Sequence, residues 1–83
     1  ASQHSYILEL KVLSKKDFSA IVEGEFTEDG KPMTKAEKQW REALDQIHQY
    51  AEAPRVEALR QGTKLHLIIM QFEGWELKRM EEV

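Results

Sequence analysis

Residues 6–13 form an apolar run, Tyr-Ile-Leu-Glu-Leu-Lys-Val-Leu, that is interrupted by two charged residues, Glu9 and Lys11. In a β-strand, successive side chains point to opposite sides, so both charges would lie on one face. Apolar Ile7 and Leu13 flank them there, and the opposite face would be entirely apolar. An ordinary half-exposed strand would be polar along one whole face, so this pattern predicts a site.

Two interpretations of Glu9 and Lys11 fit the strand pattern. Charged groups that lose water need partners or a metal ion to offset the cost of desolvation, which makes the two residues a candidate catalytic pair. They could equally form an ordinary ion pair on a surface strand. The strand by itself leaves both interpretations open.

The length of 83 residues limits the chain to one small domain, because proteins of this size bury only about 60 to 65% of their unfolded surface. It has no cysteine, which excludes disulfides and thiolate zinc sites, and its three histidines lack the spacing of zinc ligands. The net charge of −3 argues against bulk electrostatic coating of nucleic acid. The longest apolar run, residues 65–70, is far too short to span a membrane, so we expect a soluble cytoplasmic protein without membrane contacts.

Residues 14–33 separate this strand from the next regular element. The segment is rich in Ser, Lys, Asp, Glu and Gly, and we expect an insertion or a flexible loop there. Because twenty structureless residues are unusual inside a compact domain, residues 20–26 are expected to form a short extra strand, or the segment is a mobile flap.

A helix is predicted from about Thr34, which forms a capping box with Glu37. Apolar residues recur at three- and four-residue spacing as far as about residue 52 and mark one face for burial: Ala36, Trp40, Ala43, Leu44, Ile47, Tyr50 and Ala51. Pro54 and Gly62 bound a second, short helix.

Two further strands are predicted after the short helix. Residues 63–72 contain a nearly continuous apolar run at residues 65–70, which predicts a strand buried on both faces. Residues 75–80 would return as an antiparallel edge strand, with Lys78 and Arg79 protecting the edge. The order strand, helix, short helix, strand, strand predicts an α/β fold with a small mixed sheet, in which the first two strands are parallel with a right-handed connection.

On the long helix, Gln46 and Tyr50 lie four residues apart and share a face. Taken alone, this spacing is typical of amphipathic helices, with Tyr50 as a core aromatic and Gln46 at the core boundary. Together with the strand motif Glu9-Leu10-Lys11, however, Gln46-x-x-x-Tyr50 resembles the PD-(D/E)XK nuclease superfamily, specifically its RecB-like branch. The chain looks most like the nuclease domain that follows an AAA-type ATPase domain in bacterial proteins.

The resemblance covers about residue 6 to the C-terminus, apart from residues 14–33. It implies that residues 1–83 are a single domain, the C-terminal part of a nuclease-like domain with a partial restriction-endonuclease-like core. In that superfamily, an aspartate on a preceding strand and the glutamate of Glu-x-Lys bind magnesium. The resemblance therefore implies that Glu9 binds Mg²⁺ or Mn²⁺, and that Lys11 orients the attacking water or stabilises the phosphate.

Four further residues are implied to support the site. The resemblance places Gln46 and Tyr50 beside it as substrate-binding or supporting residues, and Lys15 and Lys16 are candidate phosphate contacts. The substrate would be nucleic acid, with DNA favoured over RNA.

The sequence departs from the superfamily in its missing first metal ligand, because no aspartate precedes Asp17. We therefore expect the parent protein to hydrolyse phosphodiesters with Mg²⁺, and this chain alone to be inactive without tightly bound metal. The unpaired edge of strand 6–13 is expected to favour homo-oligomers. The alternative is a non-enzymatic α/β protein-interaction module, in which Glu9 and Lys11 form a structural ion pair.

Overall fold

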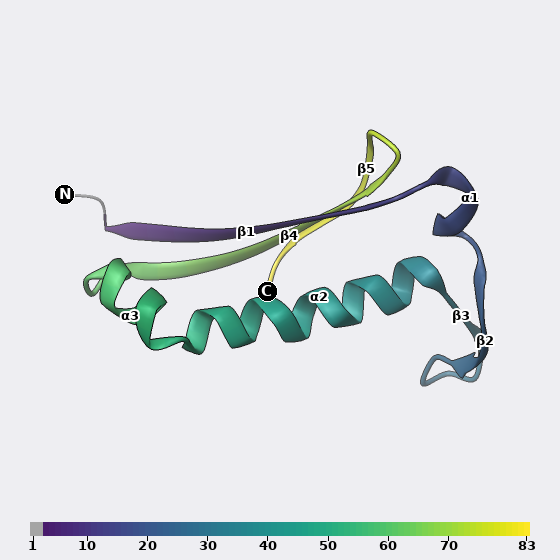
Figure 1. The fold of residues 1–83 in the computed structure, drawn as a ribbon, viewed down its shortest axis with the longest axis horizontal. Coiled ribbons are helices and arrows are strands. Elements are labelled where there is room, and N and C mark those ends of the chain that lie inside the picture. Colours follow the sequence, from purple (N-terminus) through teal and green to yellow (C-terminus); the bar gives the residue numbers. More distant parts are fainter. Residues whose placement is uncertain (1–2) are drawn as a thin grey trace.

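A computed structural model of the chain describes residues 3–83. Its elements follow in the order β1 (His4–Leu13), α1 (Lys15–Phe18), β2 (Ile21–Phe26), β3 (Pro32–Thr34), α2 (Lys35–Glu52), α3 (Pro54–Arg60), β4 (Lys64–Glu73) and β5 (Glu76–Glu82). Three strands form a sheet in the order β1-β4-β5, and β2 pairs with β3 in a separate hairpin. Figure 1 shows α2 running along the three-stranded sheet, with the small hairpin beyond the start of that helix.

The strand pairing confirms the predicted α/β fold with a small mixed sheet. β1 lies parallel to β4 along its whole length, from His4 opposite Lys64 to Leu13 opposite Glu73. β5 returns antiparallel to β4. The helices α2 and α3 form the connection between the two parallel strands, as expected of a strand-helix-strand unit. No helix in residues 3–83 is long and apolar enough to cross a membrane.

The long helix begins at the predicted capping box. The Thr34 hydroxyl accepts a hydrogen bond from the Glu37 backbone amide at 3.1 Å and donates one to the Glu37 carboxylate at 3.3 Å. The predicted stripe then packs on β4, and the buried core consists of Trp40, Ala43, Ile47, Leu67 and Ile69. This single layer of side chains between α2 and the sheet holds the parallel strands against the helix.

Tyr50 does not join the core as the helical spacing predicted, because 52% of this residue is exposed. It lies one turn after Gln46, on the side of α2 that faces β1. Since β1 is the outer strand of the sheet in the described residues, no further strand lies beyond it for Tyr50 to pack against.

The predicted burial of the fourth strand on both faces is found on one face only. Leu67, Ile69 and Gln71 of β4 are buried on the side of α2, whereas the alternate residues Ile68 and Met70 are half-buried. The apolar composition was a sound indicator of a central strand. Within residues 3–83, however, helices cover only one side of the sheet (Figure 1).

Residues 14–33 hold regular structure in place of the expected loop. The segment contains α1 and the β2–β3 hairpin, and β2 corresponds to the short strand expected at residues 20–26. An ion pair of 2.7 Å between Lys38 and Glu25 ties the hairpin to α2. Because β2 pairs with β3 and not with β1, the hairpin leaves the outer edge of β1 open.

The last strand runs from Glu76 to Glu82, slightly later than predicted, and Trp75 lies in the preceding turn with 98% of its surface exposed. Arg79, predicted to protect the sheet edge, has a different position. Its guanidinium carbon lies 3.9 Å from the ring centroid of Trp40, where it covers the end of the core through a cation–π contact.

Candidate active site

Glu9 and Lys11 lie on the face of β1 that is turned toward α2. The strand alternates along its length between exposed and half-buried residues, and both charged residues belong to the half-buried set. Ile7, on the same face, packs against the core. The side chain of Glu9 is 13% exposed and that of Lys11 is 27% exposed, so both charges are largely withdrawn from water.

Lys11 is held between two oxygen atoms that come from different elements. Its Nζ lies 3.5 Å from Oε1 of Glu9, on the same strand, and donates a hydrogen bond of 3.1 Å to Oε1 of Gln46 on α2. These contacts fix the ammonium group over the gap between β1 and the helix. The structure thus brings Glu9, Lys11 and Gln46 together.

The second carboxylate oxygen of Glu9 has no such partner. Oε2 is buried and accepts no hydrogen bond from any residue that the structure describes. A buried, unpaired oxygen of a carboxylate costs about 1–3 kcal/mol or more, so this oxygen is a candidate to bind an ordered water or a metal ion. The Glu9–Lys11 pair therefore compensates for only part of the burial of this carboxylate.

Two hydrogen-bonded amide side chains, those of Gln71 and Gln39, lie beside Lys11, and the sequence analysis did not single them out. Gln71 on β4 is the register partner of Lys11 and is 3% exposed. Its side-chain amide donates to the Ala36 carbonyl at 2.7 Å and to Oε1 of Gln39 at 3.0 Å. Gln39 in turn donates to the Val12 carbonyl at 3.3 Å. We call the hydrogen-bonded pair of Gln39 and Gln71 the clamp. Its available signal in the sequence was the amide residue Gln71, directly after the apolar run at residues 65–70.

Comparison with known families agrees with this arrangement. The family model of the PD-(D/E)XK nuclease superfamily matches residues 1–82. The chain belongs to this superfamily. No curated protein and no solved structure matches the chain. The predicted superfamily is therefore confirmed, whereas the RecB-like branch and the association with an AAA-type ATPase stay predictions.

Membership in the PD-(D/E)XK superfamily indicates a nuclease-like function on nucleic acid, and nucleases of this superfamily generally use Mg²⁺ or Mn²⁺. The donor chemistry of Glu9 fits such an ion, since hard cations prefer carboxylate oxygens and Oε2 is free of hydrogen bonds. The number of ligands does not fit a metal ion, because residues 3–83 contain no group of three or more His, Asp or Glu side chains that could hold one.

The other candidate residues lie farther out on this PD-(D/E)XK domain. The exposed Tyr50 makes no side-chain hydrogen bond to Glu9 or Lys11 within the described part of the chain. Lys15 and Lys16 are exposed on α1, after the end of β1. Lys15 shares a surface hollow with Trp75 and with two acidic residues, Glu73 and Glu76, which oppose phosphate binding there.

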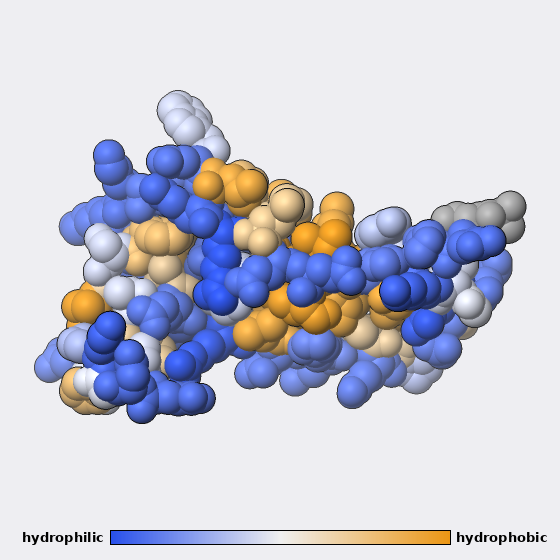
Figure 2. All heavy atoms as spheres, turned by 180° about the vertical axis from the view of Figure 1, so that it is seen from behind, coloured by the Kyte–Doolittle hydropathy of each residue, from blue (hydrophilic) through white to orange (hydrophobic). Residues whose placement is uncertain are grey.

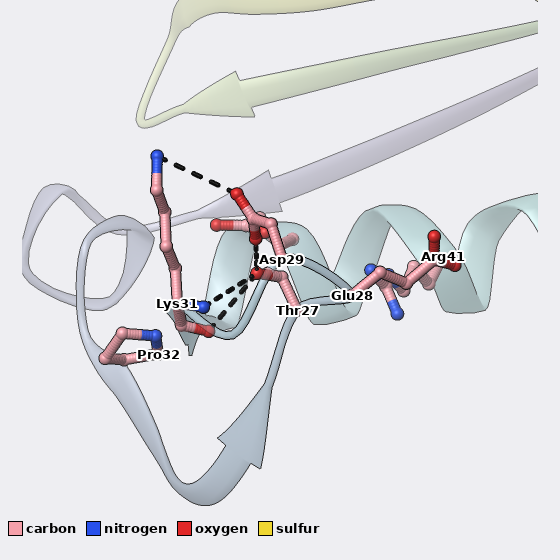
Figure 3. A pocket seen from close by; sticks show the side chains of 7 residues that line it. Thr27, Glu28, Asp29, Lys31, Pro32 and Arg41 are labelled. Atoms are coloured by element: carbon pink, nitrogen blue, oxygen red, sulfur yellow. Dashed lines mark hydrogen bonds and ion pairs between the residues drawn. The ribbon is translucent and has the colours of Figure 1, made fainter.

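Another surface hollow lies at the turn between β2 and β3 (Figure 3). There the Thr27 hydroxyl donates to the Asp29 carboxylate, and Lys31 lies 3.8 Å from the same group. The Thr27 hydrogen bond holds the pKa of Asp29 below its ordinary value, although the side chain is 62% exposed. Asp29 and Lys31 pair with each other within the turn, so their presence in this hollow is explained by the local structure of the turn.

Proposed function

We propose that this chain supplies Glu9 and Lys11 to a phosphodiester-hydrolysing site that depends on Mg²⁺ or Mn²⁺ and acts on nucleic acid in the cytoplasm. The observation that carries the proposal is Oε2 of Glu9, a buried carboxylate oxygen without a hydrogen bond. In a purely structural ion pair, both carboxylate oxygens would be expected to have partners.

Glu9 would be the metal ligand. Its carboxylate is fixed on a regular strand and is only 13% exposed, so little conformational freedom is lost when an ion binds. The bound ion would lower the pKa of a coordinated water and neutralise charge on the scissile phosphate.

Lys11 would position the attacking water or donate to a phosphate oxygen. An ammonium group has three donors, and in the structure one of them makes a hydrogen bond to Gln46, while Oε1 of Glu9 lies 3.5 Å from the nitrogen. Donor capacity therefore remains, and the 27% exposure of the side chain leaves it reachable by a substrate at the open edge of β1. Gln46 would hold the ammonium in place, and Tyr50, on the same side of α2, would contact the nucleic-acid backbone.

The site needs at least one more carboxylate than the described residues provide. We propose that a longer parent protein supplies it, in the manner of the aspartate strand of the superfamily, and that this chain alone is inactive. A single carboxylate binds Mg²⁺ or Mn²⁺ no more tightly than about 1 mM. Lys15 and Lys16 would assist through long-range attraction of phosphate rather than through the site itself.

The metal part of the proposal is tested on this chain by calorimetric titration with Mn²⁺. Weak binding, at about millimolar affinity, is expected for the wild type, and Glu9→Gln should abolish it. Glu52→Gln, on the exposed end of α2, serves as the control and should leave binding unchanged. Micromolar affinity would overturn the claim that a ligand is missing, and equal binding by Glu9→Gln would remove Glu9 from the site.

The catalytic part is tested in the parent protein with labelled DNA oligonucleotides and Mg²⁺ or Mn²⁺, with RNA as the comparison substrate. Glu9→Gln and Lys11→Ala should each reduce cleavage by about 100-fold or more, and Glu52→Gln should not. Undiminished cleavage by Glu9→Gln would refute the assignment. A parent protein that never cleaves, and that unfolds more easily without Glu9, would favour the interaction module with its 3.5 Å ion pair.

A further inference from the structure

The parallel pairing of β1 with β4 brings together two histidines that are 62 residues apart in the sequence. Nδ1 of His4 lies 2.8 Å from Nε2 of His66, and the centroids of the two rings are 4.9 Å apart. Strand alternation places His4 on the face of the sheet that is turned away from Glu9 and α2. The spacing of the histidines in the sequence gives no sign of this pair, because only the strand register creates it.

Glu82 on β5 fixes which nitrogen of His66 carries the proton. Both oxygens of its carboxylate lie 3.2 Å from Nδ1 of His66. An ionised carboxylate only accepts hydrogen bonds, so Nδ1 carries the proton and Nε2 of the neutral ring keeps its lone pair. That lone pair is directed at Nδ1 of His4. A histidine whose one ring nitrogen donates to a carboxylate, while the other is a free ligand atom, has the usual arrangement of a metal-binding histidine.

The ring of His66 is held in place, whereas that of His4 is exposed and can adjust. Tyr6, the register partner of His66, stacks on its ring with 4.8 Å between centroids and 18° between planes. The His66 side chain is only 12% exposed. Figure 2 shows a mainly hydrophilic surface at the end of the molecule where β1 begins, while apolar side chains gather over its middle. A hydrated ion can therefore approach the histidine pair.

We propose that His4 Nδ1 and His66 Nε2 together bind a divalent transition-metal ion such as Zn²⁺, with Glu82 as a positioning residue. Imidazole nitrogens suit ions of this class. Two nitrogens at about 2.0–2.1 Å from a tetrahedral ion lie about 3.3 Å apart, so the rings need to separate by only about 0.5 Å from their present 2.8 Å. The ion takes the place of the proton that the rings share, and His4 changes tautomer and stays neutral. Water completes the coordination, since residues 3–83 offer no group of three metal-binding side chains.

The histidine pair differs from the proposed Glu9 site in both position and chemistry. The two sites lie on opposite faces of the sheet. Glu9 offers carboxylate oxygen, which suits Mg²⁺ or Mn²⁺, whereas the pair offers nitrogen, which suits Zn²⁺, Ni²⁺ or Cu²⁺. The inference is therefore independent of the proposed function, and Glu9→Gln should leave Zn²⁺ binding to the pair unchanged.

Calorimetric titration of the chain with Zn²⁺ at about pH 7.5, where the imidazoles are neutral, tests the site. The wild type should bind one ion, and His4→Ala and His66→Phe should each weaken binding by about 10-fold or more. His48→Ala is the matched control, because His48 is an exposed histidine on α2. No saturable binding below about 1 mM Zn²⁺ would overturn the proposal, as would undiminished binding by the His4 and His66 variants.

A measurement on the wild type avoids any effect of substitution on folding. A small amount of paramagnetic Ni²⁺ should broaden the NMR signals of the His4 and His66 rings together and leave those of His48 sharp. Broadening of His4 alone, or of His48 first, would show that the ion binds single surface histidines and would overturn the paired site.

Glu82→Ala tests the positioning role of the carboxylate. The affinity for Zn²⁺ should fall by about 10-fold or more, and nitrogen NMR should show the proton of His66 no longer confined to Nδ1. Glu81→Ala is the matched control, because Glu81 on the same strand pairs with Arg79. An unchanged affinity and an unchanged tautomer in Glu82→Ala would overturn the role of Glu82.

Discussion

Lys11 and Gln46 are 35 residues apart in the sequence, yet Nζ of Lys11 donates a hydrogen bond of 3.1 Å to the side-chain oxygen of Gln46. The contact joins the edge strand of the sheet to the long helix and orients the only ammonium group that the Glu-x-Lys motif contributes. It is the contact through which α2 acts on the candidate site, and it can be tested without any substrate.

Replacement of Gln46 by leucine should release the Lys11 ammonium and lower the free energy of unfolding by about 0.5–1.5 kcal/mol. Gln49→Leu is the matched control, because Gln49 is an exposed amide on the same helix and makes no contact with Lys11 in the structure. Urea unfolding measures the difference. Equal effects of the two substitutions would show that the hydrogen bond contributes nothing in solution.

Replacement of Glu9 and Lys11 together by leucine should leave stability unchanged or raise it by up to about 1 kcal/mol in metal-free buffer, because the unpaired carboxylate oxygen is removed and no ammonium group is left without its counter-charge. Added Mn²⁺ should stabilise the wild type and not the variant. Thermal unfolding with and without chelator measures both effects. A clear loss of stability in metal-free buffer would instead support the structural ion pair.

The amides of Gln39 and Gln71 should act as a unit, since they share a hydrogen bond of 3.0 Å. Each single substitution to leucine should cost about 1–3 kcal/mol, because a buried polar partner loses its hydrogen bond. The double variant should cost less than the sum of the two by about 0.5 kcal/mol or more. Additive effects in denaturant unfolding would contradict a coupled clamp beside Lys11.

The pKa of Asp29 should rise toward its ordinary value of 3.8 in a Thr27→Val variant, because the hydroxyl that stabilises the carboxylate is lost. In the wild type the folded pKa lies below the unfolded one. The resulting stabilisation of the turn is therefore present above the unfolded pKa and is lost as the pH falls through the folded pKa. Carbon NMR titration of the Asp29 carboxyl group measures the shift, and an unchanged midpoint would exclude the hydroxyl as its cause.

Local sequence patterns determined β1, α2, α3, β4 and β5 and their order, whereas α1 and β3 were not predicted. Period-two alternation identified β1, the Thr34–Glu37 box located the start of α2, and the apolar run at residues 65–70 identified β4. These signals are local, because side-chain direction and capping depend only on residues a few positions apart. The pairing of Glu9 with Lys11 follows from the same alternation, since both residues sit on one strand.

The tertiary structure decided what each element packs against. Helical spacing put Tyr50 in the buried stripe, but β1 is the edge of the sheet and Tyr50 stays exposed. The composition of β4 predicted two covered faces, yet the described chain covers one. Gln71 is a buried hydrogen-bonding residue because β4 packs against α2, where its amide reaches the Ala36 carbonyl and Gln39. A residue's burial and partners depend on neighbouring layers far away in the sequence, whereas its secondary structure depends mainly on the residues beside it.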